Sequence, residues 1–341
     1  MIQKEKEFRE RCALRGLEAA DIERAVDWVR RLVEEAAGYD GGLSSASPET
    51  FKRFASLDAG AGADAPDRLL AYARYCAVIG REDLVVWLSS LLLPIGVLPA
   101  VSERLAALEG EELRDLVFRG VEIPPSGAFP EAYPAPTALV VSRLEAALPP
   151  ERAYRVLCQN VHRVPDAAFA AEKEAFGKAA TIDEWLQAWH ARQVAALERH
   201  AADGTLWYEQ RITQAVVEFV RANPEVLGGR REGNRVYITK IPYDPDRWLA
   251  STDPLERRRL ACHCPLAASS ITSGGAGVSP AWCACSAGYE KRILDVVFGL
   301  AESGGETESE VLESVLGGAG RCRFAVVIPP AVLAAKRAGY A

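Results

Sequence analysis

The pattern of apolar positions along the chain divides it into a helical part and a mixed part. After Asp21, apolar side chains recur every three or four residues, at Ile22, Val26, Val29 and Val33, which predicts one buried helical face. The same spacing and its breakers predict further helices over residues 67–79, 84–93, 100–107, 110–118 and 135–147. We therefore expect the N-terminal part of the chain to be all-helical.

Two more helices are predicted before residue 224. Thr181 and Glu184 form a capping box, in which the threonine oxygen and the glutamate each satisfy a backbone N–H at a helix start. A second helix follows the turn at Asp203-Gly204 and ends at Asn223, because the residue before a proline avoids the helical conformation. We expect these two helices to pair as an antiparallel hairpin.

The periodicity changes after Pro224. Residues 235–242 alternate in character and are rich in β-branched and aromatic side chains, which predicts a strand. Residues 309–315 and 321–328 flank a glycine-rich turn and predict a β-hairpin. Helices are expected over residues 254–262 and 286–298. The prediction is an α+β fold, with a small mixed α/β domain that contains an antiparallel hairpin.

The domain boundary is expected near residue 224. A helical domain would then cover residues 1–223, and a cysteine-rich α/β domain would cover residues 224–335. Within the first domain, residues 38–66 are rich in Ala, Gly, Ser and Asp and have the composition of a flexible linker.

Charge and hydropathy narrow the classes of partner. The 341 residues include 40 Lys and Arg against 47 Asp and Glu, for a net charge of −7. Nucleic acid is not expected as the main partner, because neutralising phosphates needs clustered cations. The charged N-terminus lacks a signal peptide's apolar stretch, so we expect a cytoplasmic location. The uncharged run from Leu84 to Ser102 is interrupted by Pro94 and Pro99, and predicts a buried helix over 84–93 rather than a membrane span.

Cysteine is the unusual residue in the composition. Four of the eight cysteines lie in one 24-residue window, as the pairs Cys262-x-Cys264 and Cys283-x-Cys285, and Cys322 follows in the last predicted strand. In the reducing cytosol such a group indicates a metal site more than a disulfide framework. Zinc binds four thiolates tetrahedrally, and an iron–sulfur cluster is equally permitted by residue type. A thiol redox site, or reduced cysteines that only pack, are the alternatives.

The spacing within the pairs sets a condition on metal binding. Two cysteines one residue apart point to opposite faces of an extended segment, so both can bind one ion only where the chain bends. His263, between the first two cysteines, would then face away from the ion. The remaining cysteines, Cys12, Cys76 and Cys158, lie in predicted helical segments and are expected to pack as small apolar residues.

Three C-terminal segments carry a family resemblance: Cys285-Ser-Ala-Gly-Tyr289 at a helix start, Val311-Leu-Glu-Ser-Val315, and Arg321-Cys-Arg-Phe324. Together they resemble the vinyl-4-reductase domain family, which includes chlorophyll-pathway vinyl reductase proteins and the sensor domains of aromatic-responsive transcription activators. Segments 237–243, 262–265 and 282–288 also resemble a group of bacterial proteins without an assigned activity. The resemblance implies a small α/β ligand-binding domain, often dimeric, with an apolar pocket and, in the sensors, a zinc beside it.

The resemblance also implies ligand positions. Cys285 matches the first cysteine of the sensors and Cys322 the last, whereas the sensor glutamate and middle cysteine fall on Val311 and Ser314, which cannot replace them. Two ligand positions are therefore vacant, and the other three cysteines of the group are the replacements. The preferred set is Cys262, Cys264, Cys285 and Cys322, with Cys283 as the next choice.

Five aromatic residues of the C-terminal part could line an apolar ligand pocket: Tyr237, Trp248, Trp282, Tyr289 and Phe298. Each could equally be ordinary core. The leading hypothesis is a cytoplasmic, zinc-stabilised protein, able to form a homodimer, that binds an apolar or aromatic small molecule, as a sensor does. The first alternative is a thiol or iron–sulfur redox enzyme that uses the same cysteines, with an activated Cys283. The second is a structural interaction protein without a ligand.

Overall fold

The computed structural model describes residues 2–39, 42–47, 50–51, 64–161 and 164–337. They form two compact units, one of Met1–Ile95 with Glu122–Tyr133 and the other of Gly96–Val121 with Pro134–Ala341. The boundary expected near residue 224 lies inside the second unit. Much of the linker expected over residues 38–66 lies outside the described residues.

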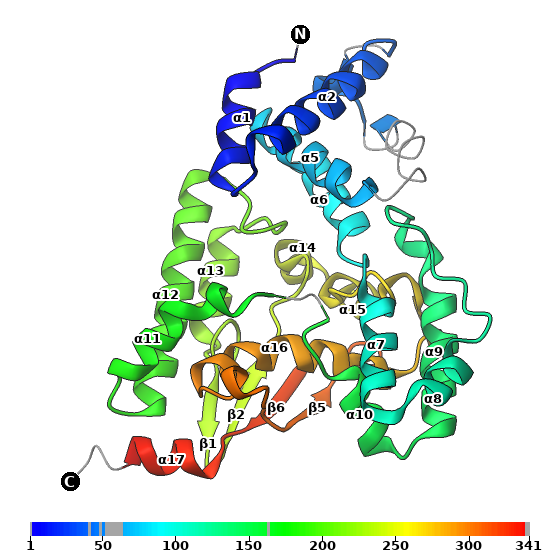
Figure 1. Ribbon diagram of the computed structural model, residues 1–341. Coiled ribbons are helices and arrows are strands. Elements are labelled where there is room, and N and C mark those ends of the chain that lie inside the picture. Colours follow the sequence, from blue (N-terminus) through cyan, green and yellow to red (C-terminus); the bar gives the residue numbers. More distant parts are fainter. Residues whose placement is uncertain (1, 40–41, 48–49, 52–63, 162–163, 338–341) are drawn as a thin grey trace. The chain divides into compact units, whose positions relative to one another are not determined.

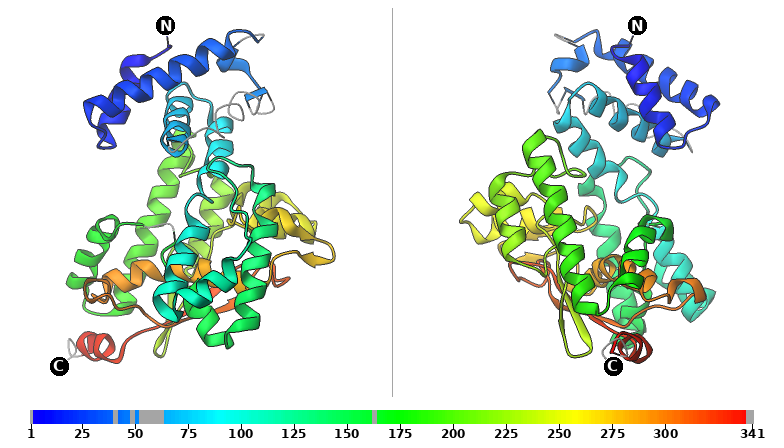
Figure 2. Two further views of the ribbon diagram at one scale, coloured as in Figure 1. Left: turned by 45° about the vertical axis from the view of Figure 1, so that its right-hand side comes forward. Right: turned by 90° about the vertical axis from the view of Figure 1, so that its left-hand side faces the viewer.

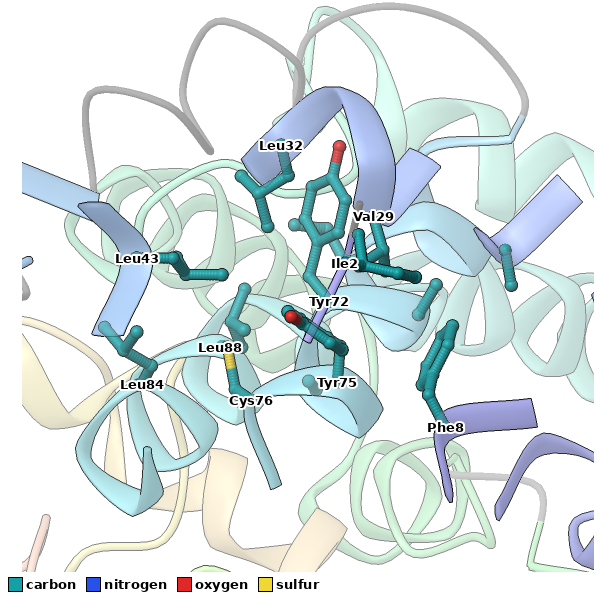
Figure 3. Packing of buried hydrophobic residues seen from close by; sticks show 14 of the residues in the cluster. Ile2, Phe8, Val29, Leu32, Leu43, Tyr72, Tyr75, Cys76, Leu84 and Leu88 are labelled. Atoms are coloured by element: carbon teal, nitrogen blue, oxygen red, sulfur yellow. The ribbon is translucent and has the colours of Figure 1, made fainter. Parts of the chain in front are cut away.

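The first unit is helical, as the sequence predicts. Among its described residues the α-helices are α1 (Glu5–Leu14), α2 (Ala19–Ala36), α3 (Gly42–Ser45), α5 (Ala65–Val78) and α6 (Glu82–Leu92). Val26 and Val29 on α2 are fully buried, which confirms the predicted face of that helix. The core also contains Phe8 and Tyr75 (Figure 3). Their rings meet edge to face, with the centroids 5.6 Å apart.

One segment of the described residues, Glu82–Glu109, is long and apolar enough to cross a membrane by length and composition. The structure divides it into α6, which ends at Leu92, one residue before the predicted end, and α7 (Val97–Glu109), with a turn between them. Of its most apolar window, 44% is buried inside the protein. Core helices of water-soluble proteins have the same composition, so the segment is weak support for a membrane span.

The second unit begins with α7 and contains most of the helices. They continue as α8 (Glu111–Phe118), α9 (Pro134–Ala147), α10 (Pro150–Leu157), α11 (Ala170–Lys178), α12 (Ile182–Asp203) and α13 (Gln214–Ala222). The capping box is present at the start of α12, where the Thr181 hydroxyl accepts from the Glu184 N–H at 3.1 Å and the Glu184 carboxylate accepts from the Ala180 N–H at 2.8 Å. Helices α12 and α13 pair, but α13 begins ten residues after Gly204, because Trp207 and Gln210 form a tight turn first.

A four-stranded antiparallel sheet completes the second unit. Its order is β1 (Arg230–Glu232), β2 (Arg235–Thr239), β6 (Arg323–Val327) and β5 (Ser309–Glu313). The predicted strand and the predicted hairpin are thereby confirmed, and the fold is mixed α and β with a helical N-terminal region. Strand β1 was not predicted, since its three residues are charged and carry no apolar alternation.

Helix α16 (Ala284–Val297) packs on one face of this sheet and closes its core (Figures 1 and 2). Residues 236, 238 and 326 point to that face from β2 and β6, because side chains alternate along a strand. Between β2 and α16 the chain forms α14 (Pro245–Ala250), α15 (Pro254–Ala261) and the short pair β3 (Ile271–Thr272) and β4 (Gly275–Ala276), and α17 (Pro330–Arg337) follows β6. The end of α15, the start of α16 and the start of β6 carry the five C-terminal cysteines, and the end of β2 lies beside them.

Candidate metal centre

Three hydrogen bonds bring these four chain segments together. The backbone N–H of Lys240, just after β2, donates to the Cys322 carbonyl at 2.9 Å. The Nε2–H of His263 donates to the carbonyl of Ile241, the residue after Lys240, at 2.5 Å. The indole Nε1–H of Trp282 donates to the Cys264 sulfur at 3.1 Å. The segments that carry the two cysteine pairs and Cys322 therefore lie side by side.

The first pair lies where the chain bends. Helix α15 ends at Ala261, and Cys262 is its extended C-cap residue. The Cys264 carbonyl then accepts from the N–H groups of Ala267 and Ala268, at 3.1 and 2.8 Å, so the chain turns directly after the second cysteine. The turn therefore lies after the pair, and the backbone at Cys262 itself is extended.

The other three cysteines lie at the edges of regular elements. Cys283 ends a single 3-10 turn over Pro280–Cys283 and is the N-cap residue of α16. Cys285 is in the first turn of that helix, and Cys322 directly precedes β6. Four of the five side chains are buried, and Cys264 is partly exposed.

Burial is the largest influence on the pKa values of these thiols. It raises the pKa of Cys283 to about 12, and it raises the pKa of Cys262 well above the usual value for a thiol. Neighbouring sulfurs add to this effect, because a thiolate disfavours a second negative charge nearby. For Cys262 these neighbours are Cys264, Cys322 and Cys283, and for Cys283 they are Cys322 and Cys264. Cys264 also acts on Cys322, so every pair within this quartet interacts in at least one direction.

Each sulfur of the quartet also receives a backbone N–H. Cys262 accepts from the N–H of Cys264, and Cys264 accepts from those of Leu266 and Ala267. The loop after β5 provides the other two donors: its Leu316 N–H lowers the pKa of Cys283, and its Val315 N–H lowers the pKa of Cys322. Donors directed at sulfur stabilise the charged thiolate, which is the form that binds metal.

Cys285 has different neighbours. Burial is the main cause that raises its pKa, followed by Cys264, and the nearby Lys240 ammonium lowers it. Cys283 and Cys158 act on it more weakly. Cys285, the cysteine preferred from the family resemblance, thus shares Cys264 and Cys283 with the quartet as neighbours, but Cys262 and Cys322 are not among its main neighbours.

In the part of the chain that the structure describes, no three His, Cys, Asp or Glu side chains are arranged as a formed metal site. The donor set nevertheless fits zinc, which takes four thiolates, and the N–H donors fit the charge that thiolates would carry.

His263 is oriented away from the sulfurs. Its Nε2–H donates to the Ile241 carbonyl, and its ring packs edge to face against Tyr243 with the centroids 5.4 Å apart. Burial and the nearby Lys240 ammonium lower its pKa to about 3, so the imidazole is neutral at physiological pH. The histidine thus serves to hold the Cys262–Cys264 segment against the end of β2, as its position between two candidate ligands suggested.

The five predicted pocket residues lie in different surroundings. Trp282 is fully buried against Cys264, and Tyr289, one turn after Cys285, is 42% exposed with the Lys240 ammonium 4.9 Å from its ring centroid. Trp248 packs against Arg257 and Phe219, Tyr237 against Arg323, and Phe298 against Phe176 in the core under α16. Of the five, Trp282 and Tyr289 lie beside the cysteines.

Sequence reasoning missed Cys158 as a neighbour of the site. A Cβ atom placed on Gly288 would lie 2.2 Å from the Gln159 nitrogen and 2.8 Å from the Cys158 carbonyl carbon, so α16 touches this backbone directly. Cys285 is one helical turn before Gly288. The Cys158 sulfur lies 3.2 Å from the Ser309 hydroxyl, which also contacts the Tyr154 hydroxyl at 2.9 Å. The glycine inside a predicted helix was the available signal, since such a glycine marks a close backbone approach.

Comparison of the chain with models of protein families, with curated proteins and with solved structures found no match.

Proposed function

We propose that this protein binds one zinc ion through Cys262, Cys264, Cys283 and Cys322, and that the ion holds the C-terminal α/β region together. The observation that carries this proposal is that hydrogen bonds join the cysteine-bearing segments: the Trp282 indole N–H donates to the Cys264 sulfur at 3.1 Å, and the end of β2 bonds both the Cys322 carbonyl and His263. The four cysteines on these segments are buried or partly buried. A closed set of four protein ligands is typical of a structural zinc site.

Ser314 adds support from the family resemblance. Its hydroxyl hydrogen-bonds the Cys283 sulfur, and it occupies the position of the middle cysteine ligand of the sensor domains. In this chain a sulfur from a different segment would take over that ligand position. The small-molecule function stays part of the proposal on the same basis: Tyr289, exposed and one turn after Cys285, is the aromatic residue that an apolar ligand beside the metal could reach.

A thiol-based enzyme is less well supported by the geometry. A nucleophilic cysteine needs a lowered pKa and access to substrate. Burial raises the pKa of Cys283, the cysteine proposed for that role, and its side chain is only 7% exposed. Four thiolates can also hold an iron–sulfur cluster, and the visible spectrum distinguishes that cofactor from zinc.

The test is metal analysis of protein purified without oxygen, together with its absorption spectrum. One zinc per chain and no visible absorption are expected, whereas brown protein with iron would favour the cluster. Replacing each cysteine by serine tests the ligand set: the C264S, C283S and C322S variants should lose the zinc, and C285S should keep it. C76S, which alters a buried cysteine of the first unit, is the control for cysteine loss alone.

Substitution with cobalt gives an independent reading of the ligands, because thiolate-to-cobalt charge-transfer absorption grows with the number of bound sulfurs. Wild type and C285S should give the same spectrum. Protein that retains no metal from cells and takes up neither zinc nor cobalt would exclude the proposal.

A further inference from the structure

A groove of about 310 Å³ lies along α12, next to the C-terminal end of α13. The two helices pack against each other in the second unit (Figure 1). The middle of this α12–α13 groove is apolar and consists of the small side chains of Ala191, Val194 and Ala195. Sites for small molecules have volumes of about 300–1,000 Å³ and combine an apolar lining with a few polar groups. The groove thus has the size of a small-molecule site, whereas a partner helix is about 10 Å across.

One end of the groove carries two polar side chains, Gln187 and His190, which are three residues apart and so lie on one face of α12. The His190 ring donates through Nε2 to the Val220 carbonyl at 3.0 Å, which ties it to α13. Gly228 also packs on this histidine, since a Cβ at Gly228 would lie 2.9 Å from the His190 Cβ. The polar end of the groove is therefore held in place by the backbone around it.

The other end of the groove carries an ion pair. The Arg221 Nη2 donates to the Glu198 carboxylate, and Glu198 is eight residues beyond His190 on α12. Because Val220 contacts His190, the Arg221 side chain extends along the groove toward this second end. Both partners are about half exposed, at 48% and 49%, and exposed ion pairs contribute little to stability. The guanidinium can therefore exchange Glu198 for another carboxylate at little cost.

We propose that the α12–α13 groove binds a small carboxylic acid with an apolar body, and that Arg221 binds the acid's carboxylate. The apolar body lies on the small side chains in the middle of the groove, and polar atoms at its far end meet Gln187 and His190. Glu198 then competes with the ligand for the same guanidinium. This inference is independent of the zinc site, because all the groove residues belong to α12 and α13.

The charges of the groove favour a carboxylate over a phosphate. A guanidinium matches the planar carboxylate group with two parallel N–H donors. Arg221 is the one cation that lines the groove, and Glu198 lies beside it. A doubly charged phosphate would meet the Glu198 carboxylate with a single cation to offset it, and like charges in contact are unfavourable. A singly charged carboxylate can replace Glu198 one for one.

The probes are hexanoate and benzoate, titrated into full-length protein by isothermal calorimetry. Two comparison compounds, 1-hexanol and benzyl alcohol, keep the apolar body without the charge and should bind more weakly by on the order of tenfold or more. R221M should weaken binding of both acids by a similar factor, and R221K by less, because an ammonium keeps the charge but lacks the fork. E198Q removes the competing carboxylate and should tighten binding.

Two matched controls lie on the same helix. A195L fills the middle of the groove and should abolish acid binding, whereas A202L adds the same side chain at an exposed position that does not line the groove. R192M removes an arginine of similar exposure, 44%, which pairs with Glu172 instead. A202L and R192M should both bind the acids as wild type does.

Weaker binding in R221M and A195L together with tighter binding in E198Q supports the proposal. Acid binding that R221M and A195L leave unchanged lies elsewhere on the protein and overturns it. The absence of saturable binding of both acids also overturns it, as does binding of inorganic phosphate at least as tight as that of the acids. If circular dichroism shows that R221M does not fold, A195L and E198Q decide. Zinc content is measured in the same samples and should be equal in all of them, so the proposed function succeeds or fails separately.

Discussion

Trp282 donates its indole N–H to the Cys264 sulfur at 3.1 Å, so the residue directly before Cys283 reaches the other cysteine pair. The tryptophan is fully buried, and its hydrogen bond lowers the pKa of Cys264 against the opposing effect of burial. One side chain thus both joins the segments of the metal centre and favours the thiolate that the centre requires.

We predict that W282F weakens metal binding and also costs about 1–2 kcal/mol of stability, because it removes this donor and leaves a small cavity. The matched control is W185F. Trp185, on α12, is equally buried, and its indole N–H donates to the Glu172 carboxylate at 3.2 Å. Urea unfolding should show a loss in both variants, whereas chelator competition should show weaker zinc binding in W282F alone. An equal zinc affinity in the two variants would mean that the sulfur contact is incidental.

Gly288 should tolerate no side chain. Its missing Cβ allows α16 to touch the backbone of Cys158 and Gln159, and backbone atoms cannot move aside as a flexible side chain can. We predict that G288A destabilises the protein by about 1–3 kcal/mol or more through overpacking.

The control for this prediction is Gly177, which lies within α11 with no atom within 4 Å of an added Cβ. G177A should stabilise by about 0.5–1 kcal/mol, because alanine restricts the unfolded chain without a clash. Thermal unfolding of both variants tests the pair, and a neutral G288A would show that the contact is looser than the structure has it.

Asp295 is the acceptor of a buried polar network in α16. Its carboxylate accepts from the Lys291 ammonium at 3.1 Å, and from the Thr307 N–H and hydroxyl at 2.6 and 2.7 Å. We predict that D295N lowers stability by roughly 2–4 kcal/mol, because Lys291 keeps its charge in a buried place with one partner fewer. D166N is the comparison: it breaks an exposed ion pair to Arg292 on the same helix and should cost less than about 1 kcal/mol. Chemical denaturation of the two variants measures this difference.

Glu225 should make stability depend on pH in the acid range. Two hydrogen bonds from the Arg323 guanidinium, at 2.7 and 2.8 Å, lower the pKa of this carboxyl below its ordinary value of 4.5, although burial opposes the shift. A group whose pKa is lower in the folded state contributes stability above its ordinary pKa, and the contribution disappears as the pH falls through the folded value. E225Q should therefore be less stable than wild type by about 1–2 kcal/mol near neutral pH.

The same reasoning fixes the acid end of the profile. As the pH falls below 4.5, the stabilities of wild type and E225Q should converge, because wild-type Glu225 becomes neutral as well. E310Q removes an exposed partner of Arg235 on the same sheet and should change stability little at any pH. Urea unfolding across the acid range tests this, and a gap between wild type and E225Q that widens on acidification would contradict the prediction.

Local sequence patterns determined most of the secondary structure. The apolar spacing along α2, the capping box at α12 and the alternation in β2 act between residues close in sequence, so each can be read without the rest of the chain. The cysteine pairs were identified for the same reason. The patterns did not predict elements whose residues have only a weak preference for one secondary structure. These are the charged strand β1 and the turn before α13, which places the start of that helix at Gln214.

Only the tertiary structure decided which residues share the candidate site. The grouping of Cys283 with Cys322, the approach of Cys264 to Cys285 and the approach of Cys158 to Gly288 all join segments many residues apart. So does the position of Lys240 between β2 and α16. Such contacts depend on how helices and strands pack through shape and burial, and no short stretch of sequence contains that information.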